Sequence, residues 1–233
     1  MTKVGVMQPY FLPYIGYWQL MNAVDVYVIF DDVNYINRGW INRNRILVNG
    51  EPQYINLLLS GASQNKLINE IALADNVTNI KKIFRTLELN YKKAPYYREV
   101  CELLEKILGN QQKNLALFLF DQIKWLAEYM EMDTRFVLSS SIEKDNSFRG
   151  QDKILNICRC LNGTEYYNAI GGQNLYSKEK FEKNGIRLWF LETDIIQYFQ
   201  GGNSFVGGLS ILDVLMHNDK EQVHQLLNRY RLI

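Results

Sequence analysis

Short apolar runs alternate with helix-like patterns along most of the chain. Val4–Met7 and Asp25–Phe30 read as buried strands, and the segment between them, residues 17–23, has the spacing of a helix. Strand, loop, helix and strand in so short a stretch are typical of a βαβ unit, whose two strands pair in parallel. The pattern therefore predicts that the two strands are neighbours in a parallel sheet.

The middle of the chain changes from strand signals to helix signals. Asn49-Gly50 separates two apolar runs, and this dipeptide favours a two-residue hairpin turn because both positions accept a positive φ. From Asn76 onward, apolar residues recur every three or four positions, which predicts amphipathic helices. The predicted helices cover residues 77–87, 96–108 and 115–130. We expect residues 76–131 to form a helical subdomain.

Strand and helix signals alternate again after residue 132. Strands are predicted at 134–138, 165–168 and 186–191, and helices at 149–161, 175–183 and 210–216. About six strands interleaved with helices predict an α/β fold, with a mostly parallel Rossmann-like sheet, flanking helices and the helical side subdomain. We expect residues 1–75 to form a strand-rich N-terminal part and residues 132–233 to complete the same sheet.

Composition and charge narrow the class of protein. The chain has 233 residues, of which 47% are hydrophobic and 22% charged, so we expect a folded globular protein. Its net charge of +1 gives no electrostatic reason to expect nucleic acid or a membrane surface as a partner. It has no apolar run long enough to span a bilayer and no signal-peptide pattern. The three cysteines are too few, and odd in number, for a disulfide framework. We therefore expect a cytoplasmic location.

Polar residues follow the first two predicted strands. Gln8 comes directly after one, and Asp31 and Asp32 after the other. Ligands of parallel sheets bind beyond the carboxyl ends of the strands, so these three are candidate catalytic residues. In a carboxylate pair one pKa can be raised, so either Asp31 or Asp32 is a candidate base. An oxyanion can be stabilised by Gln8 or by backbone N–H groups elsewhere on this edge.

Residues 34–45 combine arginine, asparagine and aromatic side chains at high density. Arg38, Arg43 and Arg45 offer guanidinium forks for phosphates or carboxylates, whereas Tyr35 and Trp40 offer stacking faces, and Asn42 and Asn44 can bind sugar hydroxyls. A second interpretation is that the arginines pair with Asp31 and Asp32 and pin the loop to its own domain. Both roles are compatible, because a paired arginine can also support a ligand contact.

Two glycine-rich stretches complete the list of candidate sites. Gly171-Gly172 follows a predicted strand and precedes a predicted helix, a junction whose free N–H groups can bind an anion. Near the C-terminus, Tyr198 and Gln200 precede a helix that begins at Ser210, with Asp213 at its third position. Ser210 and Asp213 therefore suit either a capping box or a site.

The histidines and cysteines give weaker signals. His217 and His224 are seven residues apart and have no nearby carboxylate or cysteine pattern, so we assign them neither a metal nor a catalytic role. Cys158 and Cys160 lie on a predicted helix without further ligands at zinc spacing, and we expect buried thiols. Asp31-Asp32 is adjacent, unlike the spaced Asp-x-Asp of glycosyltransferases, so no metal site is assigned.

The opening stretch VGVMQPYFLPYIGYWQLMNAVDVYVIFDDVNYINRGWINRNRI closely resembles that of the WbqC-like family. The resemblance continues through Tyr54–Leu57, Asn90-Tyr91, the Gly171-Gly172 pair and the tail Leu209–Asp213, and so covers almost the full length. It departs at Asn218-Asp219, where the family has a glycine. Tyr10, Tyr14 and Tyr17, within the opening stretch, are further candidate substrate-binding residues.

The resemblance implies a bacterial protein of O-antigen or related surface-polysaccharide biosynthesis. We therefore expect a transferase that acts on a nucleotide-linked amino sugar, by acyl or aminoacyl (glycine) transfer from a donor such as acyl-CoA. One alternative is a nucleotidylyltransferase-like enzyme, since Pro13-x-x-Gly16-Tyr17 lies where such folds carry a phosphate-binding histidine motif, although histidine is absent here. The other alternative is a non-catalytic protein that binds sugar nucleotides.

Overall fold

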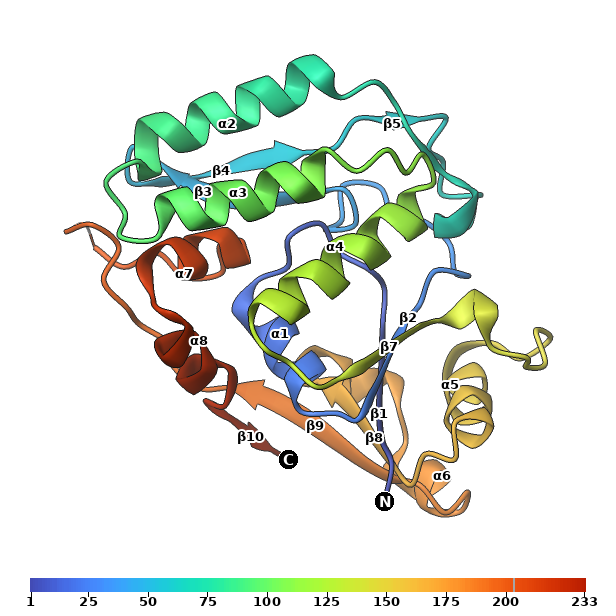
Figure 1. Ribbon diagram of the computed structural model, residues 1–233. Coiled ribbons are helices and arrows are strands. Elements are labelled where there is room, and N and C mark those ends of the chain that lie inside the picture. The colour runs from blue at the N-terminus through green and yellow to red at the C-terminus, as the bar shows by residue number, and fades with distance from the viewer. Residues whose placement is uncertain (203) are drawn as a thin grey trace.

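The computed structural model describes residues 1–202 and 204–233 and is built on a six-stranded sheet (Figure 1). The strand order is β10-β9-β8-β1-β2-β7, and every pairing is parallel except that of β10 with β9. The strands are β1 (Lys3–Met7), β2 (Val26–Ile29), β7 (Arg135–Leu138), β8 (Glu165–Ala169), β9 (Arg187–Thr193) and β10 (Tyr230–Leu232). The predicted mostly parallel α/β sheet is confirmed, whereas β10 was not predicted.

The predicted βαβ unit is present at the N-terminus. β1 pairs in parallel with β2, so that Val4 lies opposite Val26 and Met7 opposite Ile29. Helix α1 (Ile15–Asn22) connects them and begins two residues earlier than the pattern indicated. Its Trp18 is fully buried and donates its indole N–H to the Pro13 carbonyl, which fixes the proline-rich loop against the helix.

Helices cover both faces of the sheet. One buried cluster joins α5 (Gly150–Cys160) and α6 (Lys178–Glu182) to β1, β8 and β9. A larger cluster on the other side includes α1, α7 (Ile211–His217) and α8 (Lys220–Leu227). The sheet is therefore the middle of three layers, as the alternation of strand and helix signals predicted.

The connections reverse direction between β1 and β8. From β1 the chain proceeds to β2 and then β7 on one side, and later to β8 and β9 on the other. In open parallel sheets such a reversal leaves a crevice at the carboxyl ends of the two strands, where ligands bind. Gln8 follows β1 and Ile170 follows β8, so both lie at this edge.

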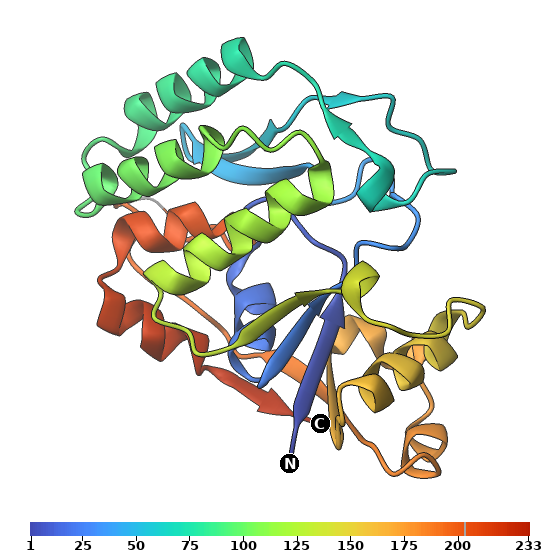
Figure 2. The same cartoon turned by 45° about the vertical axis from the view of Figure 1, so that its right-hand side comes forward.

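A second structural block lies beyond the carboxyl ends of the central strands, at the top of Figures 1 and 2. It contains the predicted hairpin of β3 (Arg43–Val48) and β4 (Glu51–Asn56), with positive φ at Asn49 and Gly50 as expected. The same block contains α2 (Val77–Tyr91), α3 (Tyr97–Leu108), α4 (Leu115–Tyr129), η1 (Ile68–Glu70) and the short pair β5 (Leu59–Ser60) and β6 (Ala72–Leu73). Its core is continuous with that of α1 and α7.

One predicted helix is wrong. Residues 175–183 do not form a single helix: a 3₁₀ helix, η3 (Ile170–Leu175), comes first, and α6 begins only at Lys178. The Ser177 hydroxyl accepts the N–H of Lys180 and so caps α6 at that point. Gly171 and Gly172 therefore lie inside the 3₁₀ helix rather than before an α-helix. Within the described residues, no helix combines the length and apolar character needed to cross a bilayer.

Candidate functional site

A charged cavity of about 540 Å³ lies beyond the carboxyl ends of β2 and β7, against the start of α5. We call it the lysine cleft. It is lined by Phe30, Asp32, Val33, Asn34, Leu67, Ser140, Lys144, Asn146, Arg149, Gly150 and Lys153. The lining side chains carry three positive charges and one negative charge, so the cleft has a net charge of about +2.

Asp32 holds the two lysines of the cleft. Its Oδ2 lies 2.9 Å from Lys144 Nζ and 3.0 Å from Lys153 Nζ, and the two lysine side chains are only 1% and 8% exposed. Lys153 also donates to the Asp32 carbonyl oxygen, and Lys144 to the Ser139 carbonyl oxygen. One carboxylate thus neutralises one of two nearly buried ammonium groups, and the remaining charge favours an anion.

The pKa of the Asp32 carboxyl differs from the expected one. Burial raises the pKa of its carboxyl, but the Ser139 hydroxyl and the ammonium groups of Lys144 and Lys153 outweigh that effect and hold the pKa below its usual value. The predicted raised pKa is therefore not found at Asp32. A carboxylate that remains ionised in this way orients cations better than it removes protons.

Asp31 is also engaged, by different partners. It is 1% exposed, and it accepts the Ser140 N–H at 2.9 Å, the Ser140 hydroxyl at 2.5 Å and the Asn69 amide at 3.3 Å. These bonds tie the end of β2 to the 3₁₀ helix η2 (Ser139–Ser141). Asp31 therefore positions Ser140 in the wall of the cleft.

The first turn of α5 faces the same cleft. Arg149 is its N-cap and Gly150 its first residue, and no side chain among the described residues caps the free N–H groups there. The eleven-residue helix directs the positive end of its dipole to this point. Uncapped N–H groups and three cations in one cavity make the lysine cleft a candidate anion site.

The lowered pKa of Asp32 predicts how stability depends on pH. Because the folded-state pKa lies below the unfolded value of about 3.8, Asp32 contributes stability above that pH and loses it as the pH falls through the folded-state pKa. We expect Asp32→Asn to be less stable than the parent at pH 7 and to approach it near pH 2–3. Thermal unfolding at both pH values measures this, and an equal deficit at both would contradict it.

The expected Arg–Asp pairs that would pin residues 34–45 are wrong, because lysines occupy Asp32. Arg43 instead donates to the Gly39 and Arg38 carbonyl oxygens, with its guanidinium 4.4 Å from the centre of the Tyr54 ring. Arg38 itself is exposed.

Other candidates of this segment also serve the fold. Tyr35 is buried and donates to Asn42 Oδ1 at 2.8 Å, and the Asn42 amide donates to the Leu57 carbonyl. Asn44 is 3% exposed and donates to the carbonyl oxygens of Phe11 and Leu12. Asn42 thus satisfies a backbone carbonyl directly after β4, and Asn44 satisfies two in the loop between β1 and α1.

The structure brings the aromatic candidates together around a second cavity. This aromatic cavity has a volume of about 300 Å³ and is lined by Tyr10, Tyr14, Trp40, Asn44, Arg45 and Gly208. The Arg45 guanidinium carbon lies 5.4 Å from the centre of the Trp40 ring, and Nη2 donates to the Gly208 carbonyl at 3.1 Å. Arg45 Nε is buried without a hydrogen-bond partner among the described residues.

Gln8 directly follows β1 and is not among the lining residues of either cavity. Its side-chain amide is 3.5 Å from the carbonyl oxygen of Asn34, a residue of the lysine cleft, and its backbone carbonyl accepts the Tyr17 hydroxyl. Tyr17 is 2% exposed and belongs to the core, so it offers no surface to a ligand. Gly172 is also buried, and it leaves room for the Asn168 side chain, which a Cβ would approach to 3.0 Å. Gly171 is exposed.

The C-terminal candidates form a buried network. Asp213 is fully buried and accepts the hydroxyls of Tyr91 and Tyr198 at 2.8 and 2.6 Å and the Gln200 amide at 2.7 Å. Burial and the neighbouring carboxylate raise the pKa of both tyrosines above their usual range, so both remain donors. Ser210 caps α7 as predicted, whereas Asp213 does not complete a capping box. The network anchors the loop that carries Gly208.

The histidines and cysteines lie away from the lysine cleft. His217 packs against the rings of Tyr91 and Tyr198. Cys158 is buried as expected, and burial raises its pKa to about 12, whereas Cys160 is exposed, contrary to expectation. Among the described residues, no three His, Cys, Asp or Glu side chains are grouped as metal ligands are.

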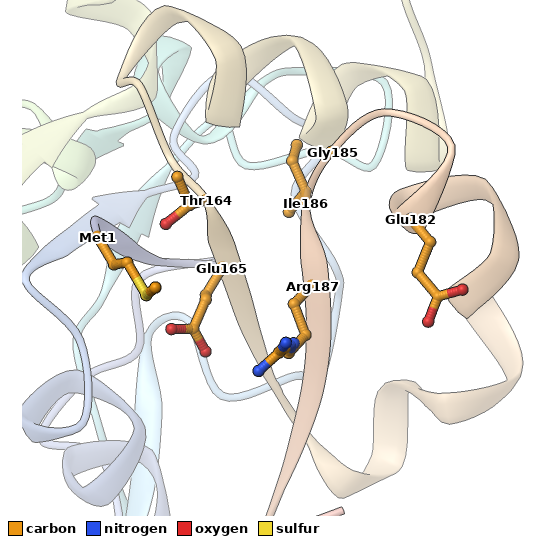
Figure 3. A pocket seen from close by; sticks show the side chains of 7 residues that line it. All are labelled: Met1, Thr164, Glu165, Glu182, Gly185, Ile186 and Arg187. Carbon is orange, nitrogen blue, oxygen red and sulfur yellow. The ribbon is translucent and has the colours of Figure 1, made fainter.

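A further cavity, of about 480 Å³, opens at the amino ends of β8 and β9 (Figure 3). It is lined by Met1, Thr164, Glu165, Glu182, Gly185, Ile186 and Arg187. Because ligands of parallel sheets bind at the opposite ends of the strands, we assign no function to it.

Sequence reasoning missed the three cations of the lysine cleft. Lys144 lies in the polar run after β7, and nothing in its neighbourhood marks it. Lys153 does carry a signal: it occupies a core-facing position of α5, one turn before the buried Ile157. A lysine at an otherwise apolar position indicates a buried partner, here Asp32, at a distance of 121 residues in the chain.

Comparisons with known proteins agree with the family resemblance of the opening stretch. A profile of the WbqC-like protein family matches residues 8–225. An uncharacterised protein of Mycobacterium tuberculosis, Rv1507c, is 30% identical over 220 residues, which cover 93% of this chain and 94% of that protein. No solved structure matches. The matched span includes every residue of the lysine cleft and of the aromatic cavity. The chain belongs to the WbqC-like protein family.

Proposed function

We propose that this protein is a transferase that acts on a nucleotide-linked amino sugar in the biosynthesis of O-antigen or a related polysaccharide. The lysine cleft is the observation that carries this proposal. Its net charge of about +2, from Lys144, Lys153 and Arg149 against Asp32, complements the two negative charges of a nucleoside diphosphate sugar. The uncapped start of α5 adds backbone N–H donors for phosphate oxygens.

Neutral polar groups border the charged part of the cleft and suit a sugar. Asn34 and Ser140 line the cavity, and Gln8 touches Asn34. Amide and hydroxyl groups can both donate to and accept from sugar hydroxyls. Among the described residues the Gln8 amide makes only one long hydrogen bond, of 3.5 Å, so it is available to donate to an oxyanion.

The proposed chemistry is acyl or aminoacyl transfer, with glycine as one possible aminoacyl group. The sugar amine attacks the carbonyl carbon of a donor such as an acyl-CoA, a C–N bond forms and the C–S bond breaks. The proton that the amine loses is taken up by the departing thiolate, so the step balances without a protein base. This route suits a site in which Asp31 and Asp32 are both engaged, and it gives these two residues positioning roles.

Isothermal titration with nucleotide sugars tests the proposal. We expect a UDP-, GDP- or dTDP-linked amino sugar to bind, and both the free nucleoside and a CMP-linked sugar, which has a single phosphate, to bind at least tenfold more weakly. Incubation with acyl-CoA or an aminoacyl donor should then give an acylated sugar nucleotide by mass spectrometry. If no nucleotide sugar binds better than its nucleoside, the proposal fails.

Nucleotidyl transfer is a second candidate. The reversal of strand order between β1 and β8, next to the Pro13–Tyr17 junction, favours it, because nucleotide-binding sheets place their ligand at that point. The buried Tyr17 weighs against it. Release of pyrophosphate from a nucleoside triphosphate and a sugar phosphate would support this candidate over acyl transfer, and binding without either reaction would indicate a non-catalytic role.

A further inference from the structure

A separate cavity, of about 540 Å³, lies where the β3–β4 turn, the end of α2 and the end of α7 meet, on the left of Figure 1. We call it the histidine cavity. Its lining includes Asn49 and Gly50 of the turn, Asn90 of α2, Phe199 and His217 of α7. It shares no lining residue with the lysine cleft or the aromatic cavity, and its volume is in the range of small-molecule sites.

The fold fixes the ring of His217 in one tautomer and one orientation. Nδ1 lies 2.8 Å from the backbone carbonyl oxygen of Asp213. Because a carbonyl oxygen only accepts, Nδ1 carries the proton, and in the neutral ring Nε2 therefore holds a lone pair. The ring also packs against Tyr91 and Tyr198, with centres 5.8 and 6.4 Å away. The acceptor on Nε2 is thus in place before a ligand binds.

Nε2 of His217 is not used by the fold. It has no hydrogen-bond partner among the described residues, and it is not one of their buried polar atoms that lack a partner, so it is accessible. The half-buried ring lines the histidine cavity. A hydroxyl or amine of a ligand in this cavity can therefore donate to Nε2.

The other free polar groups of the cavity are mostly neutral. Asn90 donates one amide N–H to the Thr86 carbonyl and has a second N–H free, and the Asn49 side chain has no partner among the described residues. Lys93 is the only lysine, arginine or carboxylate residue among the described lining residues, and it is exposed. One exposed lysine is a weak phosphate site, and His217 without a second ligand is no metal site.

Apolar side chains complete the rim of the cavity. Phe199 and Leu89 both line it and are 73% and 62% exposed. An exposed aromatic ring offers a face to the C–H face of a pyranose. Sugar hydroxyls can donate as well as accept, so they suit an imidazole lone pair on one wall and amide groups on another. A hydroxylated ring therefore uses both kinds of surface.

We infer that the histidine cavity is a second binding site, which takes a neutral saccharide. One sugar hydroxyl donates to His217 Nε2, others bond to the amides of Asn49 and Asn90, and the sugar ring packs against Phe199. The inference goes beyond the proposed function and does not rest on it, because no residue of the lysine cleft takes part.

The ring nitrogens of His217 report on this site directly. The chain has two histidines, so His224→Gln leaves one imidazole in a ¹⁵N NMR spectrum. At about pH 8, where histidine is ordinarily neutral, we expect the Nδ1–H tautomer in the free protein. Glucose, galactose, N-acetylglucosamine and rhamnose are the probes. At least one should shift the Nε2 signal, with a Kd on the order of 1 mM, whereas inorganic phosphate should not.

Variants separate the imidazole from the aromatic wall. His217→Phe keeps a ring against Tyr91 and Tyr198 but removes the acceptor, so saturation-transfer NMR of the sugar should show about tenfold weaker binding. Phe199→Ala, at an exposed position, should also weaken binding and tests the site even if His217→Phe fails to fold. His224→Gln, at the other and exposed histidine, is the matched control and should bind as the parent does.

Several results would overturn the inference. These are an Nε2–H tautomer of His217 in the free protein, an Nε2 signal that none of the four sugars moves, and equal sugar affinity of the parent and Phe199→Ala. A shift with phosphate and not with any sugar would overturn it too, and would make Lys93 part of an anion site. The nucleotide-sugar proposal for the lysine cleft stands or falls separately, by its own titration.

Discussion

Asp213→Ala is expected to lower the free energy of unfolding by about 3–5 kcal/mol, because each buried donor that is left without an acceptor costs about 1–3 kcal/mol. Asp213 is fully buried and accepts three side-chain hydrogen bonds, from Tyr91, Tyr198 and Gln200. Alanine leaves these three donors without an acceptor and adds a small cavity. Urea denaturation at pH 7 measures the loss.

Asp219 gives a matched control for this experiment. It is also an aspartate near the start of a C-terminal helix, but it caps α8 from a partly exposed position by accepting the Gln222 N–H at 2.7 Å. Loss of a cap costs about 1 kcal/mol, so Asp219→Ala should have the smaller effect. Equal losses in the two variants would show that the Asp213 network contributes no more than an ordinary cap.

The Asp213→Ala substitution should also affect the aromatic cavity. Gln200 bonds both Asp213 and the backbone of Val206, and so holds the loop that ends at Gly208. Gly208 in turn accepts from Arg45. Loss of the Asp213 anchor is therefore expected to loosen one wall of the aromatic cavity and the position of the Arg45 guanidinium.

Local patterns were sufficient to predict most of the sheet. Val4–Met7 and Asp25–Phe30 are apolar because both of their faces are covered, and the glycine-containing turn at Asn49-Gly50 needs no distant partner. β10 was missed because it has three residues and its pattern, Tyr-Arg-Leu, is partly exposed. Its pairing with β9 fixes it, and that contact is not visible in the local sequence.

The site was predicted less well, because its residues come together from distant parts of the chain. Ligands of parallel sheets bind beyond the carboxyl ends of the strands, and this rule placed Gln8, Asp31 and Asp32 at the edge of the sheet where the lysine cleft lies. It gave no information on which cations would face them. Lys144 and Lys153 reach Asp32 only because β7 lies beside β2 and α5 returns over the sheet. For the same reason, the raised pKa is not found at Asp32.

The density of planar side chains in residues 34–45 had two causes that the sequence does not separate. Asn42 and Asn44 satisfy backbone groups, and Tyr35 supports Asn42. Trp40 and Arg45 line a cavity. Asn44 faces carbonyl groups because the Pro9–Pro13 loop leaves the Phe11 and Leu12 carbonyls buried and in need of donors.

The double variant Lys144→Met/Lys153→Met is expected to weaken binding of the nucleotide sugar by at least about a hundredfold. Each lysine provides a charge-assisted hydrogen bond worth about 1.5–3 kcal/mol, and the net charge of the cleft changes from about +2 to about 0. Titration calorimetry at two salt concentrations measures the affinity. The salt dependence of the remaining binding should also decrease, because fewer charges are paired with the phosphates.

Stability has to be separated from binding in this experiment, because removal of both lysines leaves the mostly buried Asp32 carboxylate without a cationic partner. Adding Asp32→Asn to the double variant removes the unpaired charge and should recover most of the lost stability. It should not recover affinity, since an amide supplies no cation. Lys183→Met, in an exposed i,i+4 pair on α6, is the control for a lysine that serves neither purpose. Recovery of affinity together with stability in the triple variant would mean that the lysines support the fold alone, and the phosphate site would then have to be sought elsewhere on the carboxyl edge of the sheet.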